Sequence, residues 1–181
     1  MSFKKIALFA IVSAAFSSQA FAQNTITFTG KIYDQACSVQ VNGDTDASVA
    51  LGNYSKDRIA NAGDTTDYVP FTLSLVDCPA AATGVPTQAM FRFNGQTNDS
   101  NSSYFKNTSE GGETAAAGVS VELQDASRAA VTNNTDTTPV DLPADGSQAD
   151  YTFYAAMVNN GETAVVGGDV DSQVTYTVSY K

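Results

Sequence analysis

The residues that could do chemistry in this chain are its carboxylates and its two cysteines. The 181 residues include no histidine, which excludes nucleophiles activated by imidazole and zinc sites built on imidazole. No glycine-rich phosphate loop of the GxGxxG, GxxxxGKS or GxxxxGKT type is present. The 19 acidic residues leave open a secreted hydrolase that uses a pair of carboxylates. Apart from that alternative, the sequence indicates neither an enzyme nor a cofactor.

Three groups of acidic residues in predicted loops could bind a hard cation through carboxylate oxygens. They are Asp44 with Asp46, Asp64 with Asp67, and Asp169 with Asp171. None of them is part of a twelve-residue calcium loop with its glycine and terminal glutamate. Aspartate is also a common turn residue, so we predict solvated turns and no metal site.

The first 22 residues have the pattern of a secretory signal peptide. Lys4 and Lys5 precede an apolar run over residues 6–16, and Ala20-Phe21-Ala22 places small residues before Gln23. The apolar run is too short to span a bilayer comfortably. We therefore predict an exported mature chain, residues 23–181, without a membrane span.

Export would place the two cysteines, Cys37 and Cys78, in an oxidising compartment. They form no CxxC motif, and no histidine is available to activate a thiolate. We therefore expect them to form a disulfide. A bridge that closes a loop of about 40 residues would stabilise the fold by about 4 kcal/mol in the chain-entropy model.

The chain is strongly acidic. Its formal net charge of −10 becomes −12 when Lys4 and Lys5 are removed with the signal peptide. This excess of acid is typical of a soluble exported protein. It would repel a polyanion, so we do not expect nucleic acid as a partner.

Residues 24–33, directly after the predicted signal peptide, alternate as a β-strand does. Ile26, Phe28, Gly30 and Ile32 share one face, because successive side chains of an extended chain point to opposite sides. This face requires burial. The alternation alone does not decide whether the strand completes its own domain or that of a neighbour.

The rest of the chain is a succession of short alternating segments between polar turns. We predict strands at residues 36–41, 48–52, 69–79, 89–95, 104–105, 118–125, 150–158 and 174–181, a helical turn within 54–60, and a turn at Asn94-Gly95. No long helix, heptad or internal repeat is present. The fold class that fits is an all-β antiparallel sandwich.

In their order along the chain, these motifs resemble those of chaperone–usher fimbrial subunits, and within them the type 1-like major pilin family. The resemblance covers the whole mature chain. It rests on Phe28-x-Gly30-x-Ile32 before Cys37, Phe71-x-Leu73-x-Leu75-x-x-Cys78, Phe91-x-Phe93-x-Gly95, Gly118-Val119-x-Val121-x-Leu123-x-Asp125, Tyr151-x-Phe153-x-Ala155 and Tyr176-x-Val178-x-Tyr180-Lys181. The penultimate Tyr180 and Gly168, the fourteenth residue from the end, together resemble a family signature.

The resemblance implies an incomplete immunoglobulin-like sandwich that lacks its last strand. A donor strand from the neighbouring subunit completes such a sandwich by donor-strand exchange. The implied donor residues are Ile26, Phe28, Gly30 and Ile32. The implied C-terminal strand that pairs with the donor, and before that with a chaperone, contains Gly168, Val174, Tyr176, Val178, Tyr180 and Lys181.

The partners implied by the resemblance are identical or related pilin subunits, a periplasmic chaperone and an outer-membrane usher. The chain would then be a structural subunit of a surface fimbria that supports adhesion. It would divide into a signal peptide at 1–22, a donor-strand extension at 23–34 and a pilin domain at 35–181. The residues leave a different class open as well, a monomeric exported carbohydrate-binding sandwich.

Overall fold

A computed structural model describes residues 32, 36–44, 48–109 and 115–181 of the chain. The chain divides into two compact units, residues 1–32 and 33–181, and each is considered by itself. In the first unit the described residue is Ile32, which is 95% exposed. All helices and strands given below belong to the second unit.

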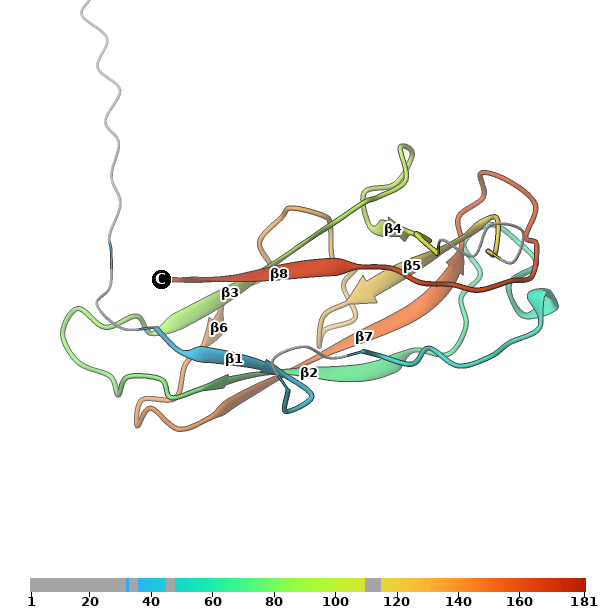
Figure 1. Cartoon of the computed structure of the whole chain (residues 1–181). Helices are drawn as coiled ribbons and strands as arrows, with labels where there is room; N and C mark the ends of the chain where they lie inside the picture. Colours follow the sequence, from blue (N-terminus) through green and yellow to red (C-terminus); the bar gives the residue numbers. More distant parts are fainter. Residues whose placement is uncertain (1–31, 33–35, 45–47, 110–114) are drawn as a thin grey trace, which may run out of the picture. The chain divides into compact units, whose positions relative to one another are not determined.

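Five antiparallel strands form the larger sheet of the second unit (Figure 1). In spatial order they are β1 (Ser38–Val41), β2 (Val69–Val76), β7 (Ala149–Asn159), β5 (Val119–Gln124) and β4 (Tyr104–Lys106). The central strand is β7, whose aromatic and aliphatic residues suit a position with neighbours on both sides. It therefore organises the sheet.

The second sheet has three strands, which are also antiparallel. Their spatial order is β6 (Val140–Asp141), β3 (Gln88–Gly95) and β8 (Val174–Tyr180). The last strand, β8, pairs with β3 from Tyr180 opposite Ala89 to Val174 opposite Gly95. The two antiparallel sheets confirm the predicted all-β sandwich.

The centre of the core is aromatic. Phe71 of β2 and Phe153 of β7 lie opposite each other in the larger sheet, with ring centroids 5.7 Å apart. Phe91 and Phe93 of β3 meet the Phe153 ring edge on, at centroid distances of 5.5 and 5.1 Å. Such pairs add about 0.5–1.5 kcal/mol each beyond their burial. Phe153 therefore joins the larger sheet to β3 of the smaller one.

The structure corrects three details of the predicted elements. Residues 48–52 do not form a strand, although Val49 and Leu51 pack against the core. Asn94 and Gly95 do not turn but continue β3, because both pair with β8. The two-residue strand β6 was not predicted, since it is too short to show an alternation.

The helical turn predicted within residues 54–60 is present as the 3-10 helix η1 (Lys56–Ile59). Its first turn begins at Ser55, whose hydroxyl accepts a hydrogen bond from the amide of Asp57 at 3.4 Å. Ile59 is buried at its end. Capping by a serine side chain explains why a short polar segment adopts this turn here.

Cys37 and Cys78 form a disulfide, as predicted. Cys37 directly precedes β1, and Cys78 lies just beyond the end of β2. The two strands pair from Ser38 opposite Val76. The bridge therefore ties the four-residue edge strand β1 to its longer neighbour.

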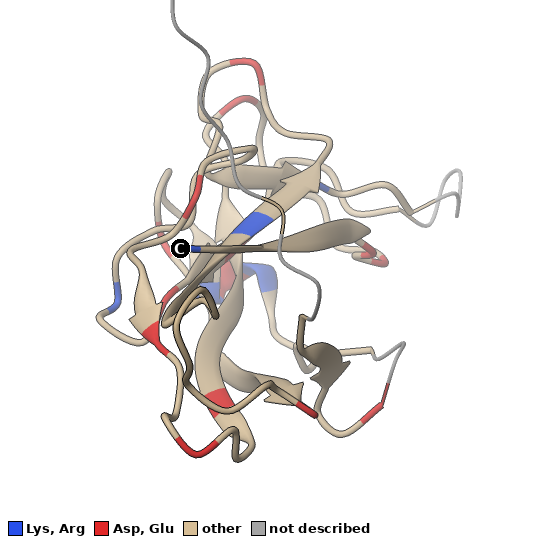
Figure 2. Ribbon diagram, turned by 90° about the vertical axis from the view of Figure 1, so that its left-hand side faces the viewer, with Lys and Arg blue, Asp and Glu red and all other residues tan. Residues whose placement is uncertain are grey.

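The described part of the chain has a mostly acidic surface. Its ion pairs join Arg58 to Asp67 at 2.8 Å, Arg92 to Asp136 at 2.8 Å and Lys106 to Asp99 at 3.8 Å. Exposed pairs of this kind add little to stability. Many of the acidic residues lie on loops around the sandwich (Figure 2). This surface therefore repels negatively charged partners and disfavours binding to them.

Two kinds of site are absent from the described residues. None of the helices found there has the length and apolar character that crossing a membrane would require. Within the same residues, no three cysteine or acidic side chains gather where they could hold a metal ion.

A polar cluster lies on the outer face of the larger sheet. The hydroxyl of Tyr68 donates to Glu122 Oε2 at 3.1 Å and accepts from Gln124 Nε2 at 2.7 Å. The guanidinium of Arg128 lies 3.5 Å from the centre of the Tyr154 ring. Burial, followed by the negative charge of Glu122, raises the pKa of Tyr68 to about 12.

We expect the stability of the fold to fall between about pH 10 and 12 in a way that depends on Tyr68. An unfolded tyrosine loses its proton near pH 10, whereas folded Tyr68 keeps it to about 12. The stabilising contribution of the protonated hydroxyl is therefore complete below about pH 10 and is lost as the pH rises through about 12. Urea unfolding at several pH values measures this loss. Tyr68→Phe should flatten the profile, and an unchanged profile would assign the loss to other groups.

Candidate functional site

The last strand, β8, has a partner on one side only. β3 pairs with one of its edges, and no described strand pairs with the other. Exposure alternates along β8, with half-buried residues between exposed ones. The half-buried residues are Val174, Tyr176, Val178 and Tyr180. On the neighbouring strand, the inward side chains of Phe91 and Phe93 are fully buried. The inner face of β8 therefore lacks part of its cover.

The backbone of β8 shows which polar groups face this open edge. Lys181 and Gln88 exchange both of their backbone hydrogen bonds, at 2.9 and 3.1 Å. In an antiparallel ladder such pairs recur at every second residue, so Ser179, Thr177 and Thr175 also direct their backbone groups toward β3. The backbone groups of the four half-buried residues point the other way. An added strand would therefore cover both their side chains and their amide and carbonyl groups.

A groove of about 960 Å³ lies along this open edge. Its floor consists of inner side chains of both sheets, including Phe71, Leu73, Phe93, Val121, Leu123 and Ala155. One wall is the chain from Gly168 to Tyr176. The opposite wall is the segment from Ser48 to Tyr54, together with Val41 of β1. The groove therefore lies between the start of β8 and the segment from Ser48 to Tyr54, which follows β1 in the sequence.

The wall that precedes β8 has no regular secondary structure over residues 170–173. Asp169 and Asp171 line the groove here and make this end acidic. Between them, Val170 packs against both hydrophobic clusters of the core. Gly168 lies in this wall, before the first residue of β8. This end of the groove therefore combines an apolar contact with negative charge.

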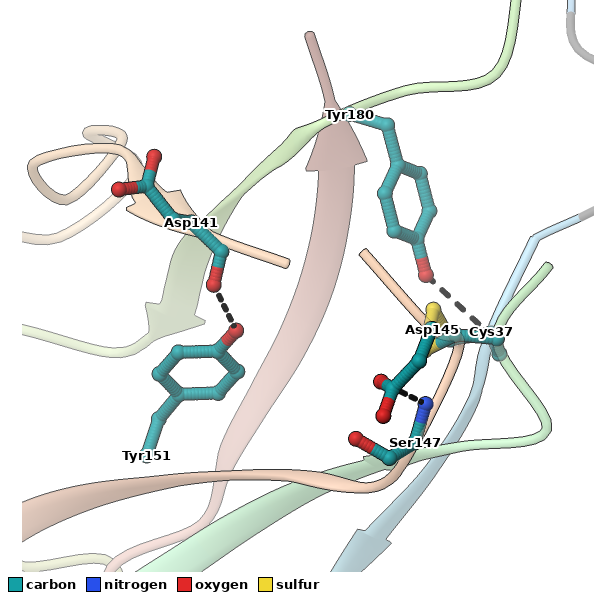
Figure 3. Close-up of a disulfide and its surroundings, with 7 residues drawn as sticks. Cys37, Asp141, Asp145, Ser147, Tyr151 and Tyr180 are labelled. Carbon is teal, nitrogen blue, oxygen red and sulfur yellow. Dashed lines mark hydrogen bonds between the residues drawn. A yellow bond between two sulfur atoms is a disulfide. The ribbon is translucent and has the colours of Figure 1, made fainter. Parts of the chain in front are cut away.

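Tyr180 closes the other end of the open edge (Figure 3). Its hydroxyl donates a hydrogen bond to the backbone oxygen of Cys37 at 3.4 Å, so the side chain reaches from β8 to the start of β1. Burial raises the pKa of Tyr180, which the hydrogen bond to Cys37 partly opposes. Of the β8 residues, those that line the groove run from Val174 to Tyr176. The groove therefore opens along the first part of the strand.

The structure brings together most of the residues that the sequence assigned to the receiving strand. The inward side chains of β8 share one face, Lys181 continues its ladder, and Gly168 lies in the wall of the groove. Of the assigned donor residues, Ile26, Phe28 and Gly30 lie outside the described residues. Ile32 belongs to the other compact unit. The role of all four stays a prediction.

The groove wall from Ser48 to Tyr54 was not predicted from the sequence. Val49 and Leu51 are spaced as in a strand, and this alternation led to the wrong element. Their apolar side chains do face the core, but the chain makes no ladder there. The sequence of this segment offers only the apolar residues Val49 and Leu51 beside Gly52 and Asn53. Such a pattern does not identify the wall of a groove.

The family of the chain follows from its sequence. A model of the family described as "Fimbrial protein" matches residues 26–181. The chain belongs to this family. The fimbrial protein is 31% identical over 167 residues to the major fimbrial subunit SMF-1 of Stenotrophomonas maltophilia, which covers 88% of this chain and 93% of the relative. It is 36% identical over 101 residues to the type-1 fimbrial protein A chain of Salmonella typhi, with 56% and 53% of the two chains covered.

The fold agrees with this assignment. A chain from the solved structure of a chaperone–usher pilus superposes with a TM-score of 0.67 at 20% identity, covering 88% of this chain and 96% of that one. The resemblance to chaperone–usher pilins and the predicted incomplete sandwich are thus confirmed. The fimbrial protein is therefore a structural subunit of a cell-surface fimbria and not an enzyme.

Proposed function

We propose that the groove along β8 accepts the N-terminal strand of a neighbouring subunit, and that this donor-strand exchange links the subunits of the fimbria. The observation that carries the proposal is the open edge of β8. One added strand there would bury the half-buried side chains of β8 and also pair with its backbone groups. Free strand edges pair readily with other strands. The donor is the extension at residues 23–34, and the pilin domain that receives it is residues 35–181.

The donor runs antiparallel to β8, as do all the strand pairs of the two described sheets. Ile32 lies six positions after Ile26, and Tyr180 likewise lies six positions after Val174. In the antiparallel register, Ile32 lies opposite Val174 and Ile26 opposite Tyr180. The outermost contact, at Ile26, is then the weakest, because Tyr180 already closes that end.

Charge supports the same orientation. Lys31 is the one charged residue within 24–33. The antiparallel donor brings it to the end of the groove that is lined by Asp169 and Asp171. A parallel donor would carry it to the opposite end. The side chain of Lys31 lies on the outer face of the donor, so its attraction to these carboxylates acts across the strand and adds only weakly to the preference for the antiparallel arrangement.

Side-chain size explains the glycine of the donor. In this register, Gly30 lies opposite the bulky Tyr176, and Phe28 lies opposite the smaller Val178. Residues directly opposite on one face have Cβ atoms about 4.5–5.5 Å apart, so a glycine leaves room for the tyrosine ring. The donor thereby complements the receiving strand in shape.

The energetics favour insertion. Burying the three large apolar donor side chains, Ile26, Phe28 and Ile32, contributes about 5–9 kcal/mol before the cost of ordering the strand. Each new backbone hydrogen bond adds about 0.5–1.5 kcal/mol. The donor also covers the apolar floor of the groove. Exchange is therefore driven mainly by apolar burial.

An open edge of this kind needs a cover before assembly, because exposed strand edges aggregate. We assign this cover to a periplasmic chaperone, which holds β8 until the outer-membrane usher brings the next donor. The C-terminal carboxylate of Lys181, directly after β8, would bind basic residues of the chaperone. The match to a subunit of a chaperone–usher pilus supports these partners.

The test compares the wild type with Gly30→Asn, each co-expressed with its chaperone. The wild type should form a ladder of SDS-resistant multimers that collapses on heating in acid. An asparagine facing Tyr176 overpacks the groove at a cost of about 1–3 kcal/mol, so assembly should fall roughly 10- to 100-fold while the chaperone-bound monomer remains.

Thr29→Asn is the matched control, because residue 29 lies on the opposite face of the predicted donor strand and the same side chain would point away from the groove. It should assemble like the wild type. Fibres in normal yield from Gly30→Asn would show that Gly30 does not face the groove, and the absence of multimers in the wild type would overturn the proposed function itself.

A further inference from the structure

The side chain of Asn107 uses all of its hydrogen-bonding capacity. Its Nδ2 donates to the backbone oxygens of Ala116 and Asp169 at 3.0 and 2.9 Å. Its Oδ1 accepts from the amides of Ser109 and Asp171 at 3.0 and 2.9 Å. An amide side chain has two donor hydrogens and two acceptor lone pairs. Asn107 therefore fits this position as few other side chains could.

These bonds join the chain after β4 to the wall of the groove before β8. Thr108 adds two hydrogen bonds to the backbone oxygen of Asp171, from its amide at 2.7 Å and its hydroxyl at 3.2 Å. The amide of Ala116 donates to Asp169 at 2.9 Å. Residues 170–173 belong to no strand. The position of this wall therefore depends on the contacts made by Asn107 and Thr108.

The held segment includes the apolar side chain that borders the groove. Val170 lies between the two bonded residues, lines the groove and packs against both core clusters. In the antiparallel arrangement proposed above, Ile32 of the donor enters opposite Val174, at this same end. A displaced wall would move Val170 relative to the site where Ile32 is to bind.

We propose that Asn107 is a positioning residue, which fixes the groove wall at residues 169–171 and so sets the rate at which Ile32 of a donor strand enters. This inference rests on the proposed function, because it requires that the groove accepts a donor. Asn107 itself does not line the groove. It acts through the backbone that it binds.

Asn107→Asp is the most informative variant, because it keeps the shape of the side chain. It replaces the Nδ2 donor with an oxygen that faces two carbonyl oxygens, and it adds a negative charge beside Asp169 and Asp171. Asn101→Asp is the matched control. It adds the same charge, but the Oδ1 of Asn101 accepts a bond from the amide of Ser103 at 2.9 Å that a carboxylate retains.

The experiment measures uptake of a synthetic peptide of residues 23–34 by the chaperone-bound mature subunit, followed on native gels with peptide in excess. A second peptide carries Ile32→Ser. We expect Asn107→Asp to take up the first peptide roughly tenfold more slowly than the wild type, since two hydrogen bonds are lost. Asn101→Asp should stay within about twofold of the wild type, as surface substitutions usually do. The slowing by Asn107→Asp should largely vanish with the Ile32→Ser peptide.

The outcomes separate the two proposals. Uptake of neither peptide by the wild type would overturn the proposed function. Normal uptake by Asn107→Asp, or an equal slowing with both peptides, would overturn the positioning role alone, because a general structural defect does not distinguish the peptides.

Thr108→Val keeps the test decisive if Asn107→Asp fails to fold. It removes only the hydroxyl bond to Asp171 and keeps the amide bond. We expect it to slow uptake of the unmodified peptide by about two- to fivefold, in line with the loss of one hydrogen bond. Uptake at the wild-type rate would contradict the proposal.

Discussion

Deletion of residues 23–33 is expected to abolish assembly of the fimbrial protein while the pilin domain stays folded. The deleted segment contains the whole proposed donor face, whereas residues 33–181 form a compact unit of their own. The groove and the open edge of β8 remain intact. Size-exclusion chromatography and SDS gels without heating should therefore show a chaperone-bound monomer and no ladder of multimers.

A peptide of residues 23–34 provides the control for this truncation. It should fill the groove of the truncated subunit without extending a fibre, because the capped subunit has no donor to offer in turn. At a peptide concentration of about 100 times Kd, binding would raise the free energy of unfolding by about 2.7 kcal/mol. Thermal unfolding with and without the peptide measures this gain. Multimers formed by the truncated chain would show that another segment links the subunits.

The strands were predictable where alternation coincides with burial. In β7, Phe153 and Ala155 are both buried on the inner face, and the period of two in the sequence reports that directly. The same holds for β8, whose inward residues alternate with polar ones in the sequence. Burial of one face of a strand against a core leaves an alternating pattern, and such strands can be predicted from one sequence.

The groove was less predictable, because its walls depend on contacts between distant residues. The 48–54 wall carries the spacing of a strand but forms no ladder. The 169–171 wall is held by Asn107, more than 60 positions away. Nothing in the local sequence of either segment records these partners. The destination of the donor strand was equally undetermined by alternation, and only the resemblance to fimbrial subunits pointed to a neighbour.

Removal of the disulfide should have the second large effect, a loss of about 4 kcal/mol in the free energy of unfolding. The bridge between Cys37 and Cys78 closes a loop of 41 residues. Typical domains have a free energy of unfolding of about 5–15 kcal/mol, so the loss would be a large fraction of the total. Guanidinium unfolding of Cys37→Ser/Cys78→Ser, compared with the wild type with and without reductant, measures it. Reductant should destabilise the wild type and leave the double variant unchanged.

Removal of the disulfide should also change the shape of the groove, in addition to lowering the free energy of unfolding. β1 is a four-residue edge strand with one neighbour among the described strands, and the disulfide ties its start to the end of that neighbour. Cys37 also accepts the hydrogen bond from Tyr180, and Val41 lines the groove. If the bridge holds this wall, the double variant should take up the donor peptide more slowly even under conditions where it remains folded. Uptake at the wild-type rate would show that the groove keeps its shape without the disulfide. The disulfide would then stabilise the protein only by restricting the unfolded chain.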